Sequence, residues 1–147
     1  MGKLIVFVCT GNTCRSPMAE YYFNSEMEKL NKSSEISAIL CGLSAAYCMP
    51  MALNAKKTLA ANNINNIADI SHESRQTDAE IIEKADYIYG ITDNHADILR
   101  ADYPEYAGKI FSMPENIGDP YGSNLEIYAA CFGRIKRAVD IIIGEMT

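Results

Sequence analysis

The segment CTGNTCRSP at residues 9–17 combines residue types that can hold and attack a phosphate group. Cys9 directly follows the apolar run KLIVFV, and five residues separate it from Arg15. A loop that closes onto a helix N-terminus turns successive backbone N–H groups inward, and together with the helix dipole it forms an anion cradle. Gly11 and Asn12 tolerate the left-handed conformations that such a loop needs. The guanidinium of Arg15 can bind two phosphate oxygens at once.

Cys9 is the candidate nucleophile of this site. The N–H groups of the cradle and the helix dipole stabilise the thiolate, which is the reactive form of cysteine, and Ser16 can donate a further hydrogen bond to it. A reaction through a phosphocysteine also needs a proton donor for the leaving group and a base for the water that follows. Asp119, in the segment GDPYG at 118–122, is the candidate for both roles. Its neighbour Tyr121 can form a wall of the substrate cleft.

Short apolar runs alternate with helical patterns along the chain. Residues 3–8 are β-branched and aromatic without polar alternation, which is typical of a parallel strand buried on both faces. Ser16 can cap the helix that follows, and Pro17 suits its first turn. Thr77 has the spacing of a capping box with the glutamate three residues later. Further strands are predicted at 35–40, 86–91 and 109–113, and further helices at 51–63, 77–85, 93–102 and 124–143.

This alternation predicts an α/β fold, a doubly wound three-layer αβα arrangement around a four-stranded parallel sheet of order 2-1-3-4. Such sheets bind ligands at the carboxyl ends of the strands, where the strand order reverses. The topology therefore places residues 9–16 at the expected site. With 147 residues, of which 48% are hydrophobic, we expect residues 1–147 to form a single domain.

The composition argues against several classes of protein. No apolar run reaches the roughly 18 residues of a membrane span, and the start of the chain lacks a signal-peptide cleavage site. Five cysteines, an odd number, indicate reduced thiols, and we expect a cytoplasmic protein. The net charge of −6 disfavours nucleic acid as a partner. With two histidines and no clustered ligand motif, we expect no metal site.

Four segments resemble, in order and spacing, the low-molecular-weight protein tyrosine phosphatases: residues 8–20, 71–76, 86–95 and 119–122. The likeness extends over essentially the whole chain. It implies hydrolysis through a phosphocysteine without metal or cofactor, with Cys9 as nucleophile, Arg15 as phosphate clamp and Asp119 as general acid. His72 matches a position that supports the asparagine of the loop. The resemblance assigns phosphate and substrate binding to Thr10, Gly11, Asn12, Thr13, Cys14, Ser16 and Tyr121.

The position four residues after the nucleophile separates branches of this family. Members directed at phosphotyrosine usually have a bulky aliphatic residue there, whereas this chain has Thr13. The segment CTGNTCRSPMAE looks like the bacterial protein-arginine phosphatase branch, in which the threonine narrows the cleft and favours a guanidinium over a phenyl ring. We therefore expect phosphorylated proteins as substrates, with phosphoarginine preferred and phosphotyrosine as the alternative. Inorganic phosphate and other oxyanions are expected as ligands.

Several of these residues also have structural interpretations. Cys14 either packs in the loop or traps an oxidised Cys9 in a reversible disulfide, as the adjacent cysteine of the family does. Asp119 can instead begin a turn, since Asp-Pro is a frequent turn opener. His72 taken alone reads as a structural histidine. His95 is expected on the surface of a helix.

Two other classes of protein have features in common with this sequence. Cys41 and Cys48 have the spacing of the redox pair in thioredoxin-coupled arsenate reductases, although in those enzymes the pair lies farther along the chain. We expect Cys41 to pack against the sheet and Cys48 to lie at the rim. A phosphate-cradling carrier or sensor, similar to the cysteine-phosphorylated components of sugar transport, is the other alternative. Asp119 favours a phosphatase, because neither alternative needs an acid for an organic leaving group.

Overall fold

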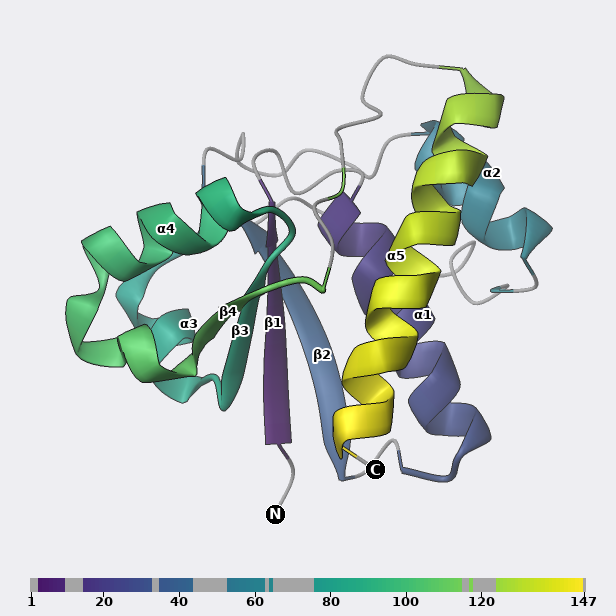
Figure 1. Ribbon diagram of the computed structural model, residues 1–147. Helices are drawn as coiled ribbons and strands as arrows, with labels where there is room; N and C mark the ends of the chain where they lie inside the picture. The colour runs from purple at the N-terminus through teal and green to yellow at the C-terminus, as the bar shows by residue number, and fades with distance from the viewer. Residues whose placement is uncertain are drawn as a thin grey trace.

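A parallel sheet of four strands, ordered β2-β1-β3-β4, lies at the centre of the structure (Figure 1). The strands are β1 (Lys3–Cys9), β2 (Ile36–Gly42), β3 (Tyr87–Gly90) and β4 (Ile110–Ser112). The predicted α/β fold and strand order are confirmed. This computed structural model describes residues 3–9, 15–32, 35–43, 53–62, 64, 76–114, 117 and 124–146, without the side chains of 15–17, 40 and 56.

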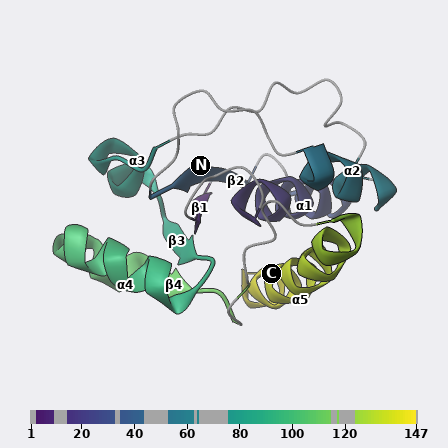
Figure 2. The same cartoon turned by 90° about the horizontal axis from the view of Figure 1, so that it is seen from above.

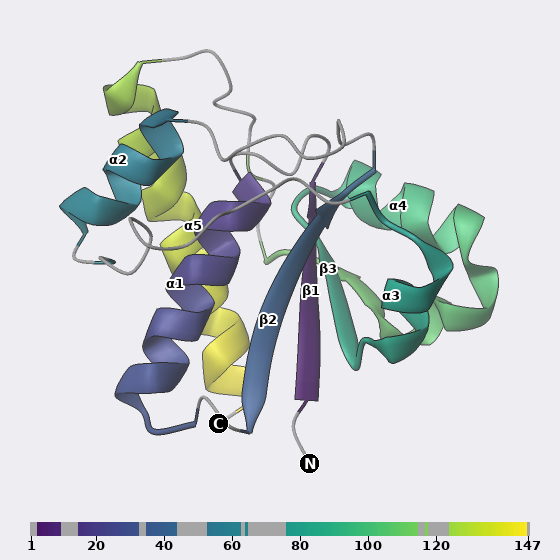
Figure 3. The ribbon, with the colours of Figure 1, turned by 180° about the vertical axis from the view of Figure 1, so that it is seen from behind.

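The helices cover the sheet on both faces, as the view along the layers shows (Figure 2). One side carries α1, α2 and α5, and the other carries α3 and α4. Seen from behind, the start of β1 and the end of α5 lie at the same end of the molecule (Figure 3). The helices are α1 (Arg15–Lys29), α2 (Leu53–Ala61), α3 (Ala79–Lys84), α4 (Asp93–Asp102) and α5 (Leu125–Met146), with a 3₁₀ helix η2 (Pro104–Lys109).

The central strand β1 is buried on both faces, as its unbroken apolar sequence predicts. Because side chains alternate along a strand, Ile5, Phe7 and Cys9 belong to the core on the α1–α5 side of the sheet. Val6 and Val8 belong to the core on the α3–α4 side. None of these side chains is more than 2% exposed. The burial of β1 on both faces fixes the position of its last residue, Cys9.

The start of α3 differs from the predicted capping box. Asp78, not Thr77, is the N-cap, and its carboxylate accepts a hydrogen bond of 2.9 Å from the N–H of Ile81. Thr77 is buried, and its hydroxyl donates to the carbonyl of Gly42 at 2.9 Å and lies 3.2 Å from the sulfur of Cys41. The capping prediction at Thr77 was wrong, because this hydroxyl ties the segment to the end of β2 instead.

Replacing Gly90 by alanine is expected to destabilise the fold by about 1–3 kcal/mol, the usual cost of overpacking. A Cβ at Gly90, the last residue of β3, would lie 2.5 Å from the backbone nitrogen of Ala96 in α4. The helix would therefore have to move away from the sheet. The measurement is the free energy of unfolding from urea denaturation.

The control for this variant is Gly133→Ala. Gly133 lies inside α5, where the nearest neighbour of an added Cβ is the Arg137 guanidinium at 3.9 Å. This alanine is expected to stabilise the helix by about 0.5–1 kcal/mol, because glycine loses more backbone entropy on folding. Equal changes in the two variants would contradict the close contact between β3 and α4.

Candidate active site

Cys9 lies at the carboxyl edge of the sheet, between the ends of two neighbouring strands. It is the last residue of β1, in register with Gly42 at the end of β2. The residue before it, Val8, is in register with Gly90 at the end of β3. The N–H of Leu43 donates to the carbonyl of Cys9 at 2.9 Å. The sheet thus holds Cys9 at the point where the strand order reverses, the place where such sheets bind ligands.

The helix α1 begins at Arg15, and residues 10–14 connect it to the end of β1. Ser16 is therefore the second residue of the helix, and its predicted role as N-cap was wrong. Pro17 lies in the first turn, as predicted, where a missing N–H leaves no bond unmade. Because the helix begins only six residues after Cys9, its first-turn N–H groups and the positive end of its dipole come directly after residues 10–14, which connect it to β1.

Most of the predicted site residues lie outside the described residues. Of the three predicted catalytic residues, the structure describes the whole of Cys9 and the backbone position of Arg15. The roles assigned to the others stay predictions. The positions outside the described residues are Thr10, Gly11, Asn12, Thr13, Cys14, His72, Asp119 and Tyr121.

The chain that precedes residues 118–123 leaves the sheet at the edge that carries Cys9. The strand β4 is parallel to β3 and β1, so its carboxyl end lies on the same side. After it, the N–H of Met113 donates to the carbonyl of Gly90 at 2.9 Å. Ile117 is fully buried in the core on the α1–α5 side. The chain that leads to Asp119 is therefore anchored at this edge.

His95 is a residue at this edge that the sequence analysis placed wrongly. It was expected on a helix surface, but its side chain is 3% exposed. The hydroxyl of Thr92 caps α4 by accepting from the N–H of His95 at 3.4 Å, and Nδ1 of His95 accepts from the N–H of Thr92 at 3.1 Å. This is a capping box with histidine in the place of the usual glutamate. The hydroxyl of Thr92 also lies 3.0 Å from Nδ1 of His95.

The described cysteines are three buried thiols, Cys9, Cys41 and Cys131. Cys41 lies within β2 and belongs to the core on the α3–α4 side, whereas Cys9 faces the α1–α5 side. The sheet therefore separates their side chains, which does not suit a disulfide relay between them. Cys48, the other member of the predicted redox spacing, lies outside the described residues.

The described part of the chain contains neither a metal-binding cluster nor a membrane-spanning helix. Within residues 3–146, leaving out the undescribed segments, no group of three or more His, Cys, Asp or Glu side chains is arranged to hold a metal ion. None of the described helices combines the length and the apolar character that crossing a membrane requires.

Comparison with known proteins identifies the family to which this chain belongs. The family model for the low molecular weight phosphotyrosine protein phosphatases matches residues 4–146. The chain belongs to this family. The match covers every helix and strand described above except the first residue of β1, and it confirms the family resemblance. As a member of the family, the protein is a cysteine-dependent protein phosphatase, a hydrolase.

The relatives of this phosphatase include enzymes named for two substrates. The protein-arginine-phosphatase of Bacillus subtilis (strain 168) is 33% identical over 135 residues, which cover 84% of this chain and 83% of the relative. The structure of the low molecular weight protein tyrosine phosphatase from T. tengcongensis superposes with a TM-score of 0.90 at 33% identity, covering 98% of this chain and 99% of that one. A mutant of the YwlE arginine phosphatase with a phosphorylated active-site serine superposes with a TM-score of 0.88 at 25% identity, covering 97% and 95%.

Proposed function

We propose that this phosphatase removes the phosphoryl group from phosphoarginine in proteins. The observation that carries the proposal is Thr13, four residues after Cys9, where tyrosine-directed members of the family usually have a bulky aliphatic side chain. The 33% identity to the protein-arginine-phosphatase of Bacillus subtilis supports it. Phosphorylated proteins are the proposed partners, and inorganic phosphate is the proposed product.

The proposed reaction begins with an attack of the Cys9 thiolate on phosphorus. The S–P bond forms while the P–N bond to the guanidine breaks, and Asp119 gives its proton to the leaving nitrogen. Arg15 and the N–H groups of residues 10–15 hold the phosphoryl oxygens, where they stabilise the negative charge of the transition state. The products of this step are a phosphocysteine and an unmodified arginine. The burial of Cys9 supports this role, because a sulfur held by the core attacks from one fixed position.

Hydrolysis of the phosphocysteine completes the cycle. The Asp119 carboxylate left by the first step accepts a proton from water, and the water oxygen attacks phosphorus. The S–P bond breaks, the electron pair returns to the sulfur as a thiolate, and inorganic phosphate leaves. One carboxyl group thus serves first as acid and then as base, and the enzyme needs no further co-reactant.

Phosphotyrosine is the second candidate substrate. The specific observation in its favour is the 33% identity and TM-score of 0.90 to a solved low molecular weight protein tyrosine phosphatase. The same thiolate and cradle would serve either substrate, since both place a tetrahedral phosphoryl group in the loop. The choice between them therefore depends on the wall around the leaving group, where Thr13 is the proposed selector.

A cytoplasmic location belongs to the same proposal. It rests on the odd number of cysteines, five, which do not suit a disulfide framework. The buried thiols of Cys9, Cys41 and Cys131 agree with a reducing compartment. The net charge of −6 supports proteins, and not nucleic acid, as the partners.

Replacing Thr13 by isoleucine is expected to move selectivity from phosphoarginine towards phosphotyrosine. A planar phenyl ring gains apolar contact with isoleucine, whereas a guanidinium loses space and a hydroxyl partner. Pocket changes of one or two methylene groups alter relative kcat/KM by roughly 10 to 200-fold. The measurement is the ratio of kcat/KM for matched phosphoarginine and phosphotyrosine peptides in wild type and variant.

Thr13→Val is the matched control, because valine keeps the shape of threonine and removes only the hydroxyl. If the size of this wall selects the substrate, valine leaves the ratio close to that of the wild type. A ratio that isoleucine does not change would remove Thr13 as the selector.

A further inference from the structure

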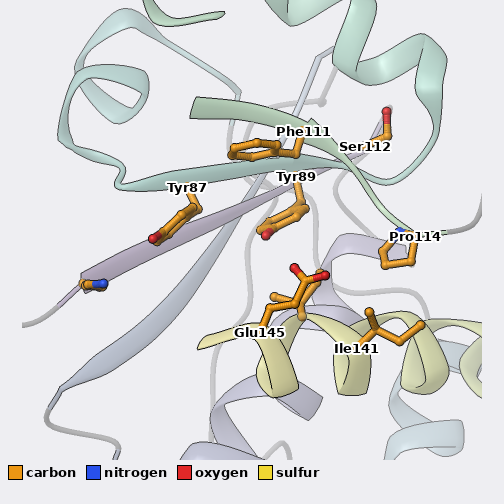
Figure 4. A pocket seen from close by; sticks show the side chains of 9 residues that line it. Tyr87, Tyr89, Phe111, Ser112, Pro114, Ile141 and Glu145 are labelled. Atoms are coloured by element: carbon orange, nitrogen blue, oxygen red, sulfur yellow. The ribbon is translucent and has the colours of Figure 1, made fainter. Parts of the chain in front are cut away.

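A groove of about 520 Å³ opens between the sheet and the C-terminal part of α5 (Figure 4). This volume lies within the range of roughly 300–1,000 Å³ that is usual for small-molecule sites. Cys9, the candidate nucleophile, is not among the described residues that line this groove. The groove is lined by Lys3, Tyr87, Tyr89, Phe111, Ser112, Pro114, Ile141, Ile142 and Glu145.

Three aromatic rings from β3 and β4 form one wall of the groove. The ring of Phe111 lies 6.3 Å from that of Tyr87 and 5.7 Å from that of Tyr89, measured between centroids. The helix α5 packs against α1 and α2 and leaves this edge of the sheet partly uncovered. Phe111, on the edge strand β4, remains 39% exposed.

Glu145 provides a negative charge opposite this aromatic wall. Its carboxylate points from α5 toward Tyr89 and Phe111 (Figure 4). Burial, and then the negative charge of Glu145, raise the pKa of Tyr89 to about 12, which agrees with a carboxylate close to that ring. Among the described residues, none forms a hydrogen bond or ion pair with the Glu145 side chain.

One cation already lies on the same wall. The ammonium group of Lys3 is 5.7 Å from the ring centroid of Tyr87, within the range of a cation–π interaction. Lys3 is the only basic residue among the described residues that line the groove. It occupies the end at Tyr87. The end formed by Tyr89, Phe111 and Glu145 combines aromatic faces with a carboxylate that forms no ion pair within the described part of the chain. The chemistry of that end is complementary to a second cation.

We propose that the groove binds a guanidinium group at the end formed by Tyr89, Phe111 and Glu145. A guanidinium is planar and weakly hydrated, so it stacks on aromatic rings better than an ammonium does. Its forked N–H groups also match both oxygens of the Glu145 carboxylate. The group can belong to free arginine or to an arginine side chain of a polypeptide. The proposal rests on the chemistry of this end of the groove and not on the substrate of the active site, and the candidate nucleophile Cys9 is not among the described residues that line the groove.

The test is a titration of the whole protein followed by backbone amide NMR shifts, with inorganic phosphate in excess to occupy the catalytic loop. Free arginine and a glycine-flanked arginine peptide are compared with the same two compounds built on citrulline, which has the same shape without the charge. Millimolar binding of either arginine compound is expected, with shifts centred on Ser112 and Glu145, and weaker or undetectable binding of citrulline. The arginine compound that binds with the higher affinity shows whether the guanidinium belongs to free arginine or to a polypeptide.

Three variants of exposed charges, one of them a control, locate the binding. Glu145→Gln is expected to weaken arginine binding by about tenfold or more, because it removes a charged hydrogen-bond partner. Glu105→Gln is the matched control, since Glu105 is an exposed carboxylate on η2 outside the groove and its loss should change nothing. Lys3→Met is expected to strengthen binding about two- to threefold, because it removes a like charge and uncovers the ring of Tyr87.

Three results would overturn the proposal. They are equal binding of arginine and citrulline, an affinity for arginine that Glu145→Gln leaves unchanged, and the absence of binding by both arginine compounds. Phe111→Leu is a second check on the same site, because it keeps an apolar side chain but removes the aromatic face. It should weaken arginine binding and leave the hydrolysis of an aryl phosphate unchanged.

Discussion

Replacing Cys9 by serine is expected to abolish turnover while the protein still binds oxyanions. A serine hydroxyl does not ionise to an attacking anion as the Cys9 thiol does, whereas Arg15 and the backbone N–H groups of the loop remain. The loss in kcat should reach about 10⁴-fold or more, as for other enzymes that lose their nucleophile. The measurements are turnover of a generic aryl phosphate and inorganic phosphate binding by calorimetry.

The matched control is Cys131→Ser. Cys131 is a buried thiol of α5 in the same core as Cys9 and is not one of the predicted site residues, so its replacement is a matched change in packing. This variant should keep turnover close to that of the wild type. Retained turnover in Cys9→Ser would remove Cys9 as the nucleophile, whatever the control shows.

Replacing Asp119 by alanine is expected to slow substrates with poor leaving groups by about 10²–10⁴-fold, the usual value of general acid catalysis. A basic leaving group needs a proton in the transition state, whereas the nitrophenolate of an activated aryl phosphate leaves without one. The measurement is kcat/KM across a series of aryl phosphates of increasing leaving-group pKa, which should show a steeper dependence in the variant.

Asp119→Asn controls for shape, since the amide keeps the size of the side chain but has no acidic proton that it can transfer to a leaving group. It should reproduce the selective slowing seen with alanine. Equal slowing of good and poor leaving groups would indicate that Asp119 positions the loop instead of donating a proton.

The fold could be predicted because its signals are local and repeated. The unbroken apolar run of β1 predicts burial on both faces, and the alternation of strands and helices predicts the order β2-β1-β3-β4. The position of Cys9 at the carboxyl edge follows from these two facts alone. The resemblance to the phosphatase family added the predicted chemical roles of the site residues, because the topology by itself does not assign them.

Other features depend on tertiary contacts that the sequence does not encode locally. Thr77 has the spacing of a capping box, but its hydroxyl donates to the end of β2 instead. His95 was expected on a helix surface, but its ring is buried and accepts from the N–H of Thr92. The groove beside Glu145 exists because α5 packs on α1 and α2 and leaves Phe111 partly uncovered. Asp119 and Thr13 lie outside the described residues, so their roles rest on the sequence and on family membership.

The most direct test of arginine phosphatase activity is the ratio of kcat/KM that the wild-type enzyme shows for two matched peptides. The peptides share one sequence and differ only in a central phosphoarginine or phosphotyrosine, and the release of inorganic phosphate is measured under identical conditions. A ratio in favour of phosphoarginine is predicted, because Thr13 replaces the bulky aliphatic residue that suits a phenyl ring. A ratio in favour of phosphotyrosine would contradict the proposal and make the enzyme a tyrosine phosphatase of the same family.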